Sequence, residues 1–161
     1  MVTMIKIDTI DKIISDLLIE DGRMSCTKIA SRIGGISERA VRYRIDRLIK
    51  NKIISIHGNV HAEGLGLAVF ADVFIEVEPS LVQKIAQQLA SYESISYVAC
   101  STGQNDISIQ VFAHDNNELF NFVTDVIGQI SGIRKTHISF VPLRIKDDQI
   151  WHIPSFCVQE D

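Results

Sequence analysis

The stretch that decides the fold of the N-terminal part is SCTKIASRIGGISERAVRYRIDRLIKN, residues 25–51. Ser25 and Ser37 each precede a run of apolar residues at helical spacing, and a serine hydroxyl can accept a hydrogen bond from a free backbone N–H in the first turn of a helix. Gly34 and Gly35 lie between the two runs. Since glycine readily ends a helix, they predict the end of the first helix. The pattern predicts a short helix, a tight turn and a longer helix, which is the helix-turn-helix arrangement.

A further amphipathic helix is predicted before this stretch, from Asp8 to Glu20, ending at Asp21-Gly22-Arg23. The three helices would share one small core, because each has apolar residues on one face. The residues expected in that core are Ile10, Ile13, Ile14, Leu17 and Leu18 in the first helix, Ile29, Ala30 and Ile33 in the second, and Val41, Ile45, Leu48 and Ile49 in the third, which runs to about Asn51.

The polar side of the third helix is the candidate reader of DNA. A helix fits the major groove, where arginine can bind guanine edges and where phosphates accept hydrogen bonds from arginine, serine and tyrosine. The alternative is an ordinary solvated basic face. The predicted DNA-binding residues are Ser37, Glu38, Arg39, Arg42, Tyr43 and Arg47.

Charge is distributed unevenly along the chain. Residues 1–60 hold 11 Lys and Arg against 7 Asp and Glu, whereas the rest holds 5 against 13. Between Arg23 and Lys52 there are nine basic residues and two acidic ones. This asymmetry favours double-stranded DNA as the partner of the N-terminal part and a different task for the acidic part.

The third helix is followed by a short apolar run, residues 53–56, and by a second one near Val60, which together predict a wing-like hairpin. Three glycines between Gly58 and Gly66 predict a hinge. The predicted division is a helix-turn-helix domain over 1–58, a hinge over 59–66, a dimerisation and ligand-sensing domain over 67–143 and a tail over 144–161.

Beyond the hinge, a strand-helix-strand unit occurs twice. The first unit has strands at about 67–77 and 94–101 around a helix over 80–92, for which Ser80 and Gln83 form a capping box. The second has an alternating strand from Ile107 to Ala113, a helix capped by Asp115 and Glu118 and closed by Gly132, and a strand at about 133–141. The core side of that second helix is expected to be Leu119, Phe122, Val123, Val126 and Ile130.

Two such units predict an α+β protein with a winged helix-turn-helix domain followed by a ferredoxin-like βαββαβ domain, in which both helices cover one face of an antiparallel sheet. The first strand has apolar residues on both sides, with Phe70 and Phe74 on one side and Val73 and Ile75 on the other. We therefore expect the open face to be buried in a homodimer.

Several function classes find no support. No catalytic or phosphate-binding motif occurs, so the chain is not expected to be an enzyme or to carry a cofactor. His57 and His61 have a metal-like spacing, but the surrounding glycines argue against a helix, and no metal is expected. Three separated cysteines fit a reducing compartment, and no long apolar run is present. A cytoplasmic protein with no membrane segment is predicted.

The chain resembles the Lrp/AsnC, or feast/famine, family of transcriptional regulators. The resemblance rests on IDTIDKIISDLLIEDGRMSCTKIASRIG, ISERAVRYRIDRLIKNKIIS, AEGLGL and STGQNDI, in that order. The extra glycine of Gly34-Gly35 departs from the family pattern. The tail with Trp151, Pro154 and Cys157 also departs from it and has no functional explanation.

The resemblance implies a C-terminal domain of the RAM type, dimers that assemble to octamers, and an amino-acid effector bound between dimers. Physically, Gly103 would let backbone approach a ligand and Asp106 could bind an α-ammonium group, although the same loop also reads as an ordinary hairpin turn. The implied effector residues are Ser101, Thr102, Gly103, Gln104, Asn105 and Asp106, with Thr136 and Ile138 from the last strand.

Two alternatives share this architecture. One is an enzyme resembling the sirohaem decarboxylases, for which His114, His137 and His152 would be the candidate residues. The other is an architectural DNA-binding protein without any effector. Tetrapyrrole binding would identify the first, and an amino acid that changes DNA affinity would exclude the second.

Overall fold

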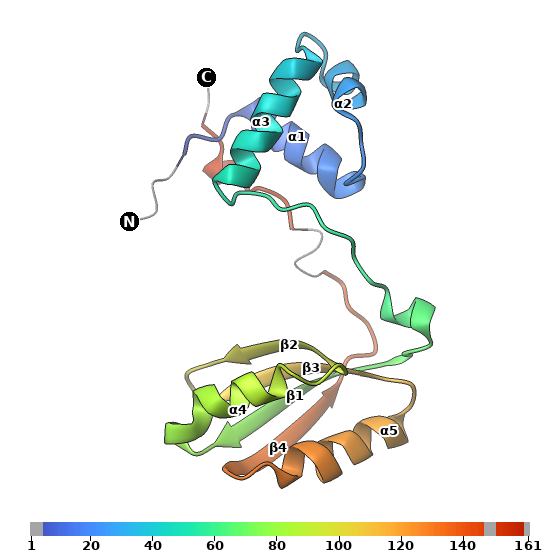
Figure 1. Ribbon diagram of the computed structural model, residues 1–161, viewed down its shortest axis with the longest axis vertical. Helices are drawn as coiled ribbons and strands as arrows, with labels where there is room; N and C mark the ends of the chain where they lie inside the picture. The colour runs from blue at the N-terminus through green and yellow to red at the C-terminus, as the bar shows by residue number, and fades with distance from the viewer. Residues whose placement is uncertain (1–4, 147–150, 160–161) are drawn as a thin grey trace. The chain divides into compact units, whose positions relative to one another are not determined.

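The computed structural model describes residues 5–146 and 151–159. The chain forms two compact units, one of Met1–Asn59 together with Ile145–Asp161 and the other of Val60–Arg144. The first holds a helical domain and the second an α+β domain (Figure 1).

Three helices make up the N-terminal domain: α1 (Thr9–Glu20), α2 (Cys26–Ile33) and α3 (Glu38–Lys50). The predicted caps are confirmed, because the hydroxyl of Ser25 accepts a hydrogen bond from the Lys28 N–H and that of Ser37 accepts one from the Ala40 N–H, both at 3.2 Å. At α1 the cap is reciprocal: Asp8 accepts from the Asp11 N–H and Asp11 accepts from the Asp8 N–H.

The core of this domain is built on one residue from each helix, Ile14, Ile29 and Val41, together with Met24. Leu48 is also fully buried, as predicted. Ile49 was expected in the core but is 42% exposed. It lies about 100° further around the helix than Leu48, which places it at the rim of the buried stripe.

The turn between α2 and α3 consists of residues 34–37. Gly34 and Gly35 both have positive φ, 73° and 69°, a conformation that other residues rarely adopt. Both positions of the turn therefore have a backbone conformation that favours glycine, and this is how the turn accommodates the extra residue.

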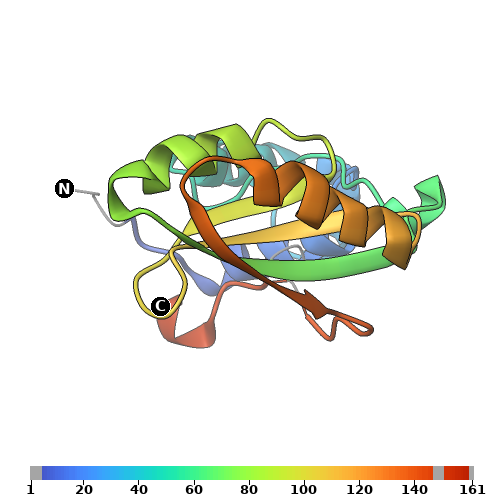
Figure 2. The same ribbon diagram turned by 90° about the horizontal axis from the view of Figure 1, so that it is seen from below.

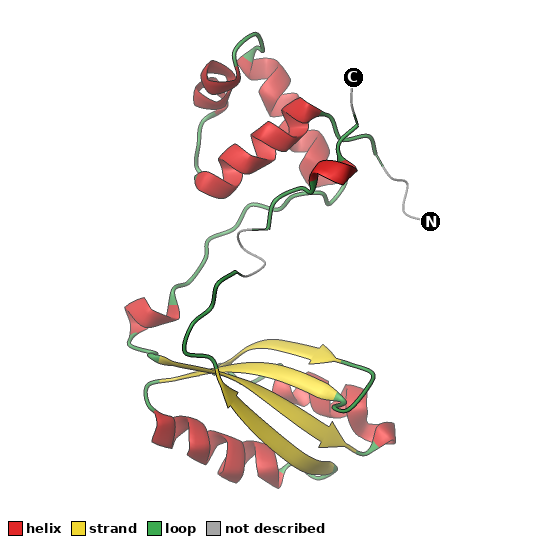
Figure 3. Ribbon diagram, turned by 180° about the vertical axis from the view of Figure 1, so that it is seen from behind, coloured by secondary structure: helices red, strands yellow, loops and turns green. Residues whose placement is uncertain are grey.

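The predicted wing is wrong. Between α3 and the first strand, the described chain contains only a 3-10 turn, Ala62–Leu65, and Figure 3 shows the rest as loop. Ile53, Ile56 and Val60 stay 40%, 46% and 75% exposed. A two-stranded hairpin needs a covered apolar face to be stable, and these apolar residues stay partly exposed in loop.

The second unit is a four-stranded antiparallel sheet of β1 (Val69–Val77), β2 (Ile95–Cys100), β3 (Ile107–Ala113) and β4 (Ile133–Phe140), in the order β2-β3-β1-β4. Helices α4 (Val82–Leu89) and α5 (Asn116–Asn121) lie on one face (Figure 2). The predicted ferredoxin-like sandwich is confirmed.

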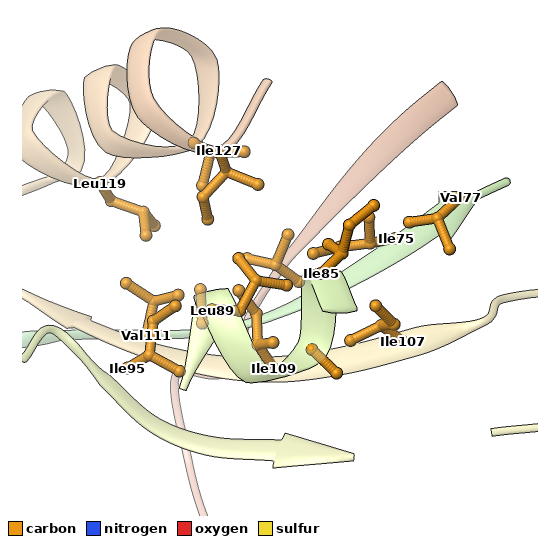
Figure 4. Close-up of a cluster of buried hydrophobic side chains, with 14 of the residues drawn as sticks. Ile75, Val77, Ile85, Leu89, Ile95, Ile107, Ile109, Val111, Leu119 and Ile127 are labelled. Atoms are coloured by element: carbon orange, nitrogen blue, oxygen red, sulfur yellow. The ribbon is translucent and has the colours of Figure 1, made fainter. Parts of the chain in front are cut away.

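The core lies between this sheet face and the helices (Figure 4). Strands β1 and β3 bury alternate residues, as a period of two requires. The fully or almost fully buried side chains are Ala71, Val73, Ile75 and Val77 from β1, Ile107, Ile109, Val111 and Ala113 from β3, and Ile85, Leu89, Leu119, Val123 and Ile127 from the helical layer.

Two details of the helical layer differ from expectation. Val126 is 36% exposed and Ile127 is buried in its place, because α5 continues as a π-helical turn, Phe122–Val126, whose wider winding moves the buried position one residue along the chain. The Ser80 capping box is also absent, since a 3-10 turn, Pro79–Leu81, delays the start of α4. The Asp115 cap is confirmed, with the Glu118 N–H donating at 2.8 Å.

The opposite sheet face mixes apolar and charged residues. Phe70 and Phe112 are paired across β1 and β3 with ring centroids 4.8 Å apart, and the Arg144 guanidinium lies 4.1 Å from the Phe70 ring centre. Glu76 pairs with Lys135 of β4 at 3.4 Å. No helix of this unit covers this face, so its burial in a dimer stays a prediction.

Candidate functional site

The outer side of α3 carries five of the six predicted DNA-binding residues. Ser37, Glu38, Arg39, Arg42 and Tyr43 are all exposed, Tyr43 by 69%. The buried residues Val41 and Leu48 fix the opposite side of the helix in the core. The structure thus presents these polar side chains together on a rigid element.

Glu38 organises this outer face. One carboxylate oxygen accepts a hydrogen bond from the Thr27 hydroxyl of α2 at 2.8 Å, and the other accepts one from the Arg42 guanidinium at 3.0 Å. The Thr27 bond, followed by the Arg42 bond, lowers the pKa of Glu38. Glu38 therefore stays ionised and restrains Arg42, while Thr27, which the sequence did not single out, links the two helices of the motif.

Arg47, the sixth predicted DNA-binding residue, is paired within the domain, and its contact with DNA stays a prediction. Its guanidinium forms an ion pair with Asp11 of α1, a side chain with no exposed surface. Arg44 joins the same cluster, donating to Asp8 at 2.6 Å and to Asp11 at 2.8 Å. The ion pair therefore holds Arg47 within the domain and fixes α3 against α1.

The electrostatics of this inner cluster follow from the pairing. Burial alone would raise the pKa of Asp8, but hydrogen bonds from the Asp11 N–H and the Arg44 guanidinium hold it below its ordinary value. A buried carboxylate such as Asp11 is tolerated only when it is paired, and two arginines supply that pairing.

The predicted effector loop, residues 101–106, joins β2 to β3. Ser101, Thr102, Gly103 and Gln104 are exposed, and Gly103 has a φ of 144°, which favours glycine. The loop is closed by the Ser101 N–H, which donates to the Asp106 carbonyl at 2.9 Å. Its outer part is therefore open to a ligand.

Asp106 has a structural bond as well. Its carboxylate accepts a hydrogen bond from the Val77 N–H at 2.9 Å, and its own N–H donates to the Ile75 carbonyl at 3.0 Å. The loop is thereby fixed to the end of β1, where the pairing between β1 and β4 is irregular.

Thr136 is in the same row of the sheet as the end of this loop, because Ile75 pairs with both Thr136 and Ile107. Ile138 is two residues further along β4 and packs partly against the core. Thr136 therefore lies level with the end of the loop but on the other side of β1, and Ile138 is only partly available. A groove of about 380 Å³ beside α4, lined by Lys84, Gln88, Tyr92 and Gln129 among others, contains none of these residues.

The histidines of the enzyme alternative are dispersed. His114 pairs with Glu118 at 2.7 Å and His137 is exposed on β4, whereas His152 belongs to the other unit. Among the described residues, no three His, Cys, Asp or Glu side chains form a cluster that could hold a metal ion. Within 5–146 and 151–159, no helix is long and apolar enough to cross a membrane.

Family models match both parts of the chain. Residues 7–49 match the AsnC-type helix-turn-helix domain and residues 70–151 match the Lrp/AsnC ligand binding domain. An uncharacterized HTH-type transcriptional regulator of Pyrococcus furiosus is 35% identical over 136 residues, covering 84% of this chain and 91% of the relative. The regulator LrpA of Pyrococcus abyssi is 30% identical over 141 residues, covering 87% and 99%.

Solved structures show the same fold. AsnC of E. coli aligns with a TM-score of 0.80 and 21% identity over 89% of this chain and 97% of that one. A regulator of Neisseria meningitidis, solved as a complex with L-Met, gives 0.80 and 22% over 88% and 94%. The fold and the helix-turn-helix define a DNA-binding transcriptional regulator. The chain belongs to the Lrp/AsnC family.

Proposed function

We propose that the protein reads its operator through the outer face of α3, with Ser37, Glu38, Arg39, Arg42 and Tyr43 at the DNA. The observation that carries this proposal is the exposure of that face on a helix whose other side is fixed by the core and by the Asp11 cluster. Arg39 forms no ion pair with any residue that the structure describes, so its five donors are available for phosphate or base.

The test is binding to a labelled fragment from upstream of the protein's own gene, in a salt titration with unrelated competitor DNA. Arg39→Ala and Arg42→Ala should each weaken specific binding by about 5- to 150-fold, equivalent to about 1–3 kcal/mol for a base contact. Lys84→Ala removes the same charge from the other unit and serves as the control. Equal affinities for all four proteins would contradict the assignment.

The second part of the proposal is an amino-acid effector at residues 101–106, with Thr136 and, to a smaller extent, Ile138. The exposed loop with a positive-φ glycine supports it, and the L-Met complex of the Neisseria relative indicates the ligand class. The open sheet face would form a homodimer, which suits a helix-turn-helix reader of two half-sites, and the resemblance to the family supports assembly to octamers.

Effector action is tested by adding each L-amino acid to the DNA-binding assay. Asp106→Asn keeps an acceptor for the Val77 N–H and removes the charge that would bind an α-ammonium group. We expect it to bind DNA normally and to lose the response. A normal response would remove Asp106 from the site, and no response in the native protein would favour an effector-independent regulator.

A non-enzymatic role is part of the proposal, since the relatives are named as transcriptional regulators. A transcriptional regulator acts in the compartment that contains the DNA, and we propose that this protein is cytoplasmic. A tetrapyrrole added to the purified protein should give no change in visible absorbance.

A further inference from the structure

The C-terminal segment, residues 151–159, belongs to the N-terminal unit although it follows β4 in sequence. It contains one 3-10 turn, Ser155–Cys157. The two family models end at residues 49 and 151, so almost all of this segment lies outside them.

Backbone pairing joins the segment to the residue that leads into α1. Val158 and Ile7 form a parallel β-bridge, and the Gln159 N–H donates to the Ile7 carbonyl at 2.9 Å. Ile7 is only 6% exposed although it precedes the helix and is not part of the core around Ile14. Apolar residues of the segment that are partly buried are Ile153, Pro154 and Val158.

A side-chain pair makes a second contact with α1. The His152 Nδ1 lies 2.8 Å from one carboxylate oxygen of Asp16, and the other oxygen accepts a hydrogen bond from the Lys12 ammonium at 2.6 Å. Burial alone would raise the pKa of Asp16, but the hydrogen bonds from Lys12 and His152 lower it. The segment therefore contacts both the start and the middle of α1. Phe156, by contrast, is 89% exposed.

The place of attachment is close to the elements that hold α3. Ile7 directly precedes Asp8, which caps α1 and pairs with Arg44 of α3. Anything that holds Ile7 in position also restrains the residue that joins α1 to the helix proposed to read DNA.

We propose that residues 151–159 are a docking segment that binds the DNA-binding domain of the same chain at Ile7 and Asp16. The effector-sensing domain is then joined to the DNA-binding domain twice, through residues 51–68 and through the tail. The regulatory meaning of this second link rests on the proposed function, but the docking itself does not.

The first test is a disulfide trap. In full-length protein carrying Cys26→Ala, Cys100→Ser and Cys157→Ser, the pair Ile7→Cys and Val158→Cys is introduced. Neighbouring strand residues lie about 4.8 Å apart, within the span of a disulfide. We expect mild oxidation to give a monomeric cross-linked chain on a denaturing gel. A disulfide-linked dimer would show that a second copy supplies the segment, and no disulfide would show that it does not dock; either result overturns the proposal.

The second test keeps Ile7 intact. Val158→Asp should release the segment and speed exchange of the Gln159 amide hydrogen by about tenfold or more, since its hydrogen bond to Ile7 would be lost. Phe156→Asp is the matched control, with the same substitution at an exposed site of the same segment, and should leave that exchange unchanged. Equal exchange rates in both variants would contradict docking. Neither measurement involves DNA, so a failed docking proposal is distinguished from a failed DNA-binding proposal.

Discussion

The two faces of α3 use the same residue type for opposite purposes. On the inner face, Arg44 and Arg47 have side chains 23% and 31% exposed and pair with the buried Asp11. On the outer face, Arg42 is 64% exposed and, among the described residues, pairs with Glu38 of its own helix. The difference teaches that the partner and burial of an arginine, not its presence on the helix, determine whether it is available to DNA.

The largest effect should come from the inner face. Asp11→Ala leaves Arg44 without one of its two acceptors and Arg47 with none, so we expect the N-terminal domain to lose about 3 kcal/mol of unfolding free energy. Amide hydrogen exchange at the buried Val41 and Leu48 in urea would measure it. A loss below about 0.5 kcal/mol, the range of ordinary surface substitutions, would mean that the cluster does not hold α3.

Arg47→Ala and Arg42→Ala form the direct contrast. We expect the first to destabilise the domain by about 1.5–3 kcal/mol, because it removes a charged hydrogen bond to a buried group. The second should leave the free energy of unfolding nearly unchanged, because an exposed ion pair contributes little. The same exchange experiment, run beside the DNA titration, checks both. If Arg42→Ala were the more destabilising variant, the two faces would have been assigned the wrong way round.

Lowering the pH should weaken the ion pairs on the inner face of α3. The pKa of Asp8 is lower in the folded protein than its ordinary value, so its stabilising effect is complete above that value and is lost as the pH falls through the folded value. We expect the free energy of unfolding of the native protein to exceed that of Asp8→Asn by about 1 kcal/mol at pH 6. This difference should disappear as the pH falls below the ordinary pKa of 3.8 and through the lower folded value. Urea unfolding across this range tests it, with Glu93→Gln as a control in the other unit. A margin independent of pH would contradict the ionic role of Asp8.

The smallest effect concerns the outer face. Thr27→Val removes the hydroxyl that binds Glu38 and keeps the shape of the side chain. Arg42 would be less restrained, and we expect DNA affinity to fall by about two- to fivefold, because the exposed bond from Thr27 to the Glu38 carboxylate acts on Arg42 only indirectly. Thr27→Ser, which retains the hydroxyl, should restore it. No difference between the two variants would indicate that Glu38 orients Arg42 without Thr27.

Periodicity and caps were sufficient to predict the three helices, the turn and the βαββαβ order, because each rests on local spacing that the core then uses. The failures have physical causes of their own. Val126 was misplaced because a π-turn breaks the helical period, and the wing was predicted from apolar residues that lie in loop and stay partly exposed. Helical spacing alone also cannot show that Asp11, 36 residues earlier, pairs with Arg47, whose contact with DNA stays a prediction.

The docked tail has a consequence for spectroscopy. The chain has a single tryptophan, Trp151, and it is the first residue of the docking segment, 62% exposed and outside both hydrophobic cores. Intrinsic tryptophan emission would then follow the detachment of this segment, whereas circular dichroism would follow the helices and the sheet. The unfolding curves from the two methods would therefore not coincide. Such a difference is usually taken as a sign of a folding intermediate, but here it would report only the detachment of one short segment.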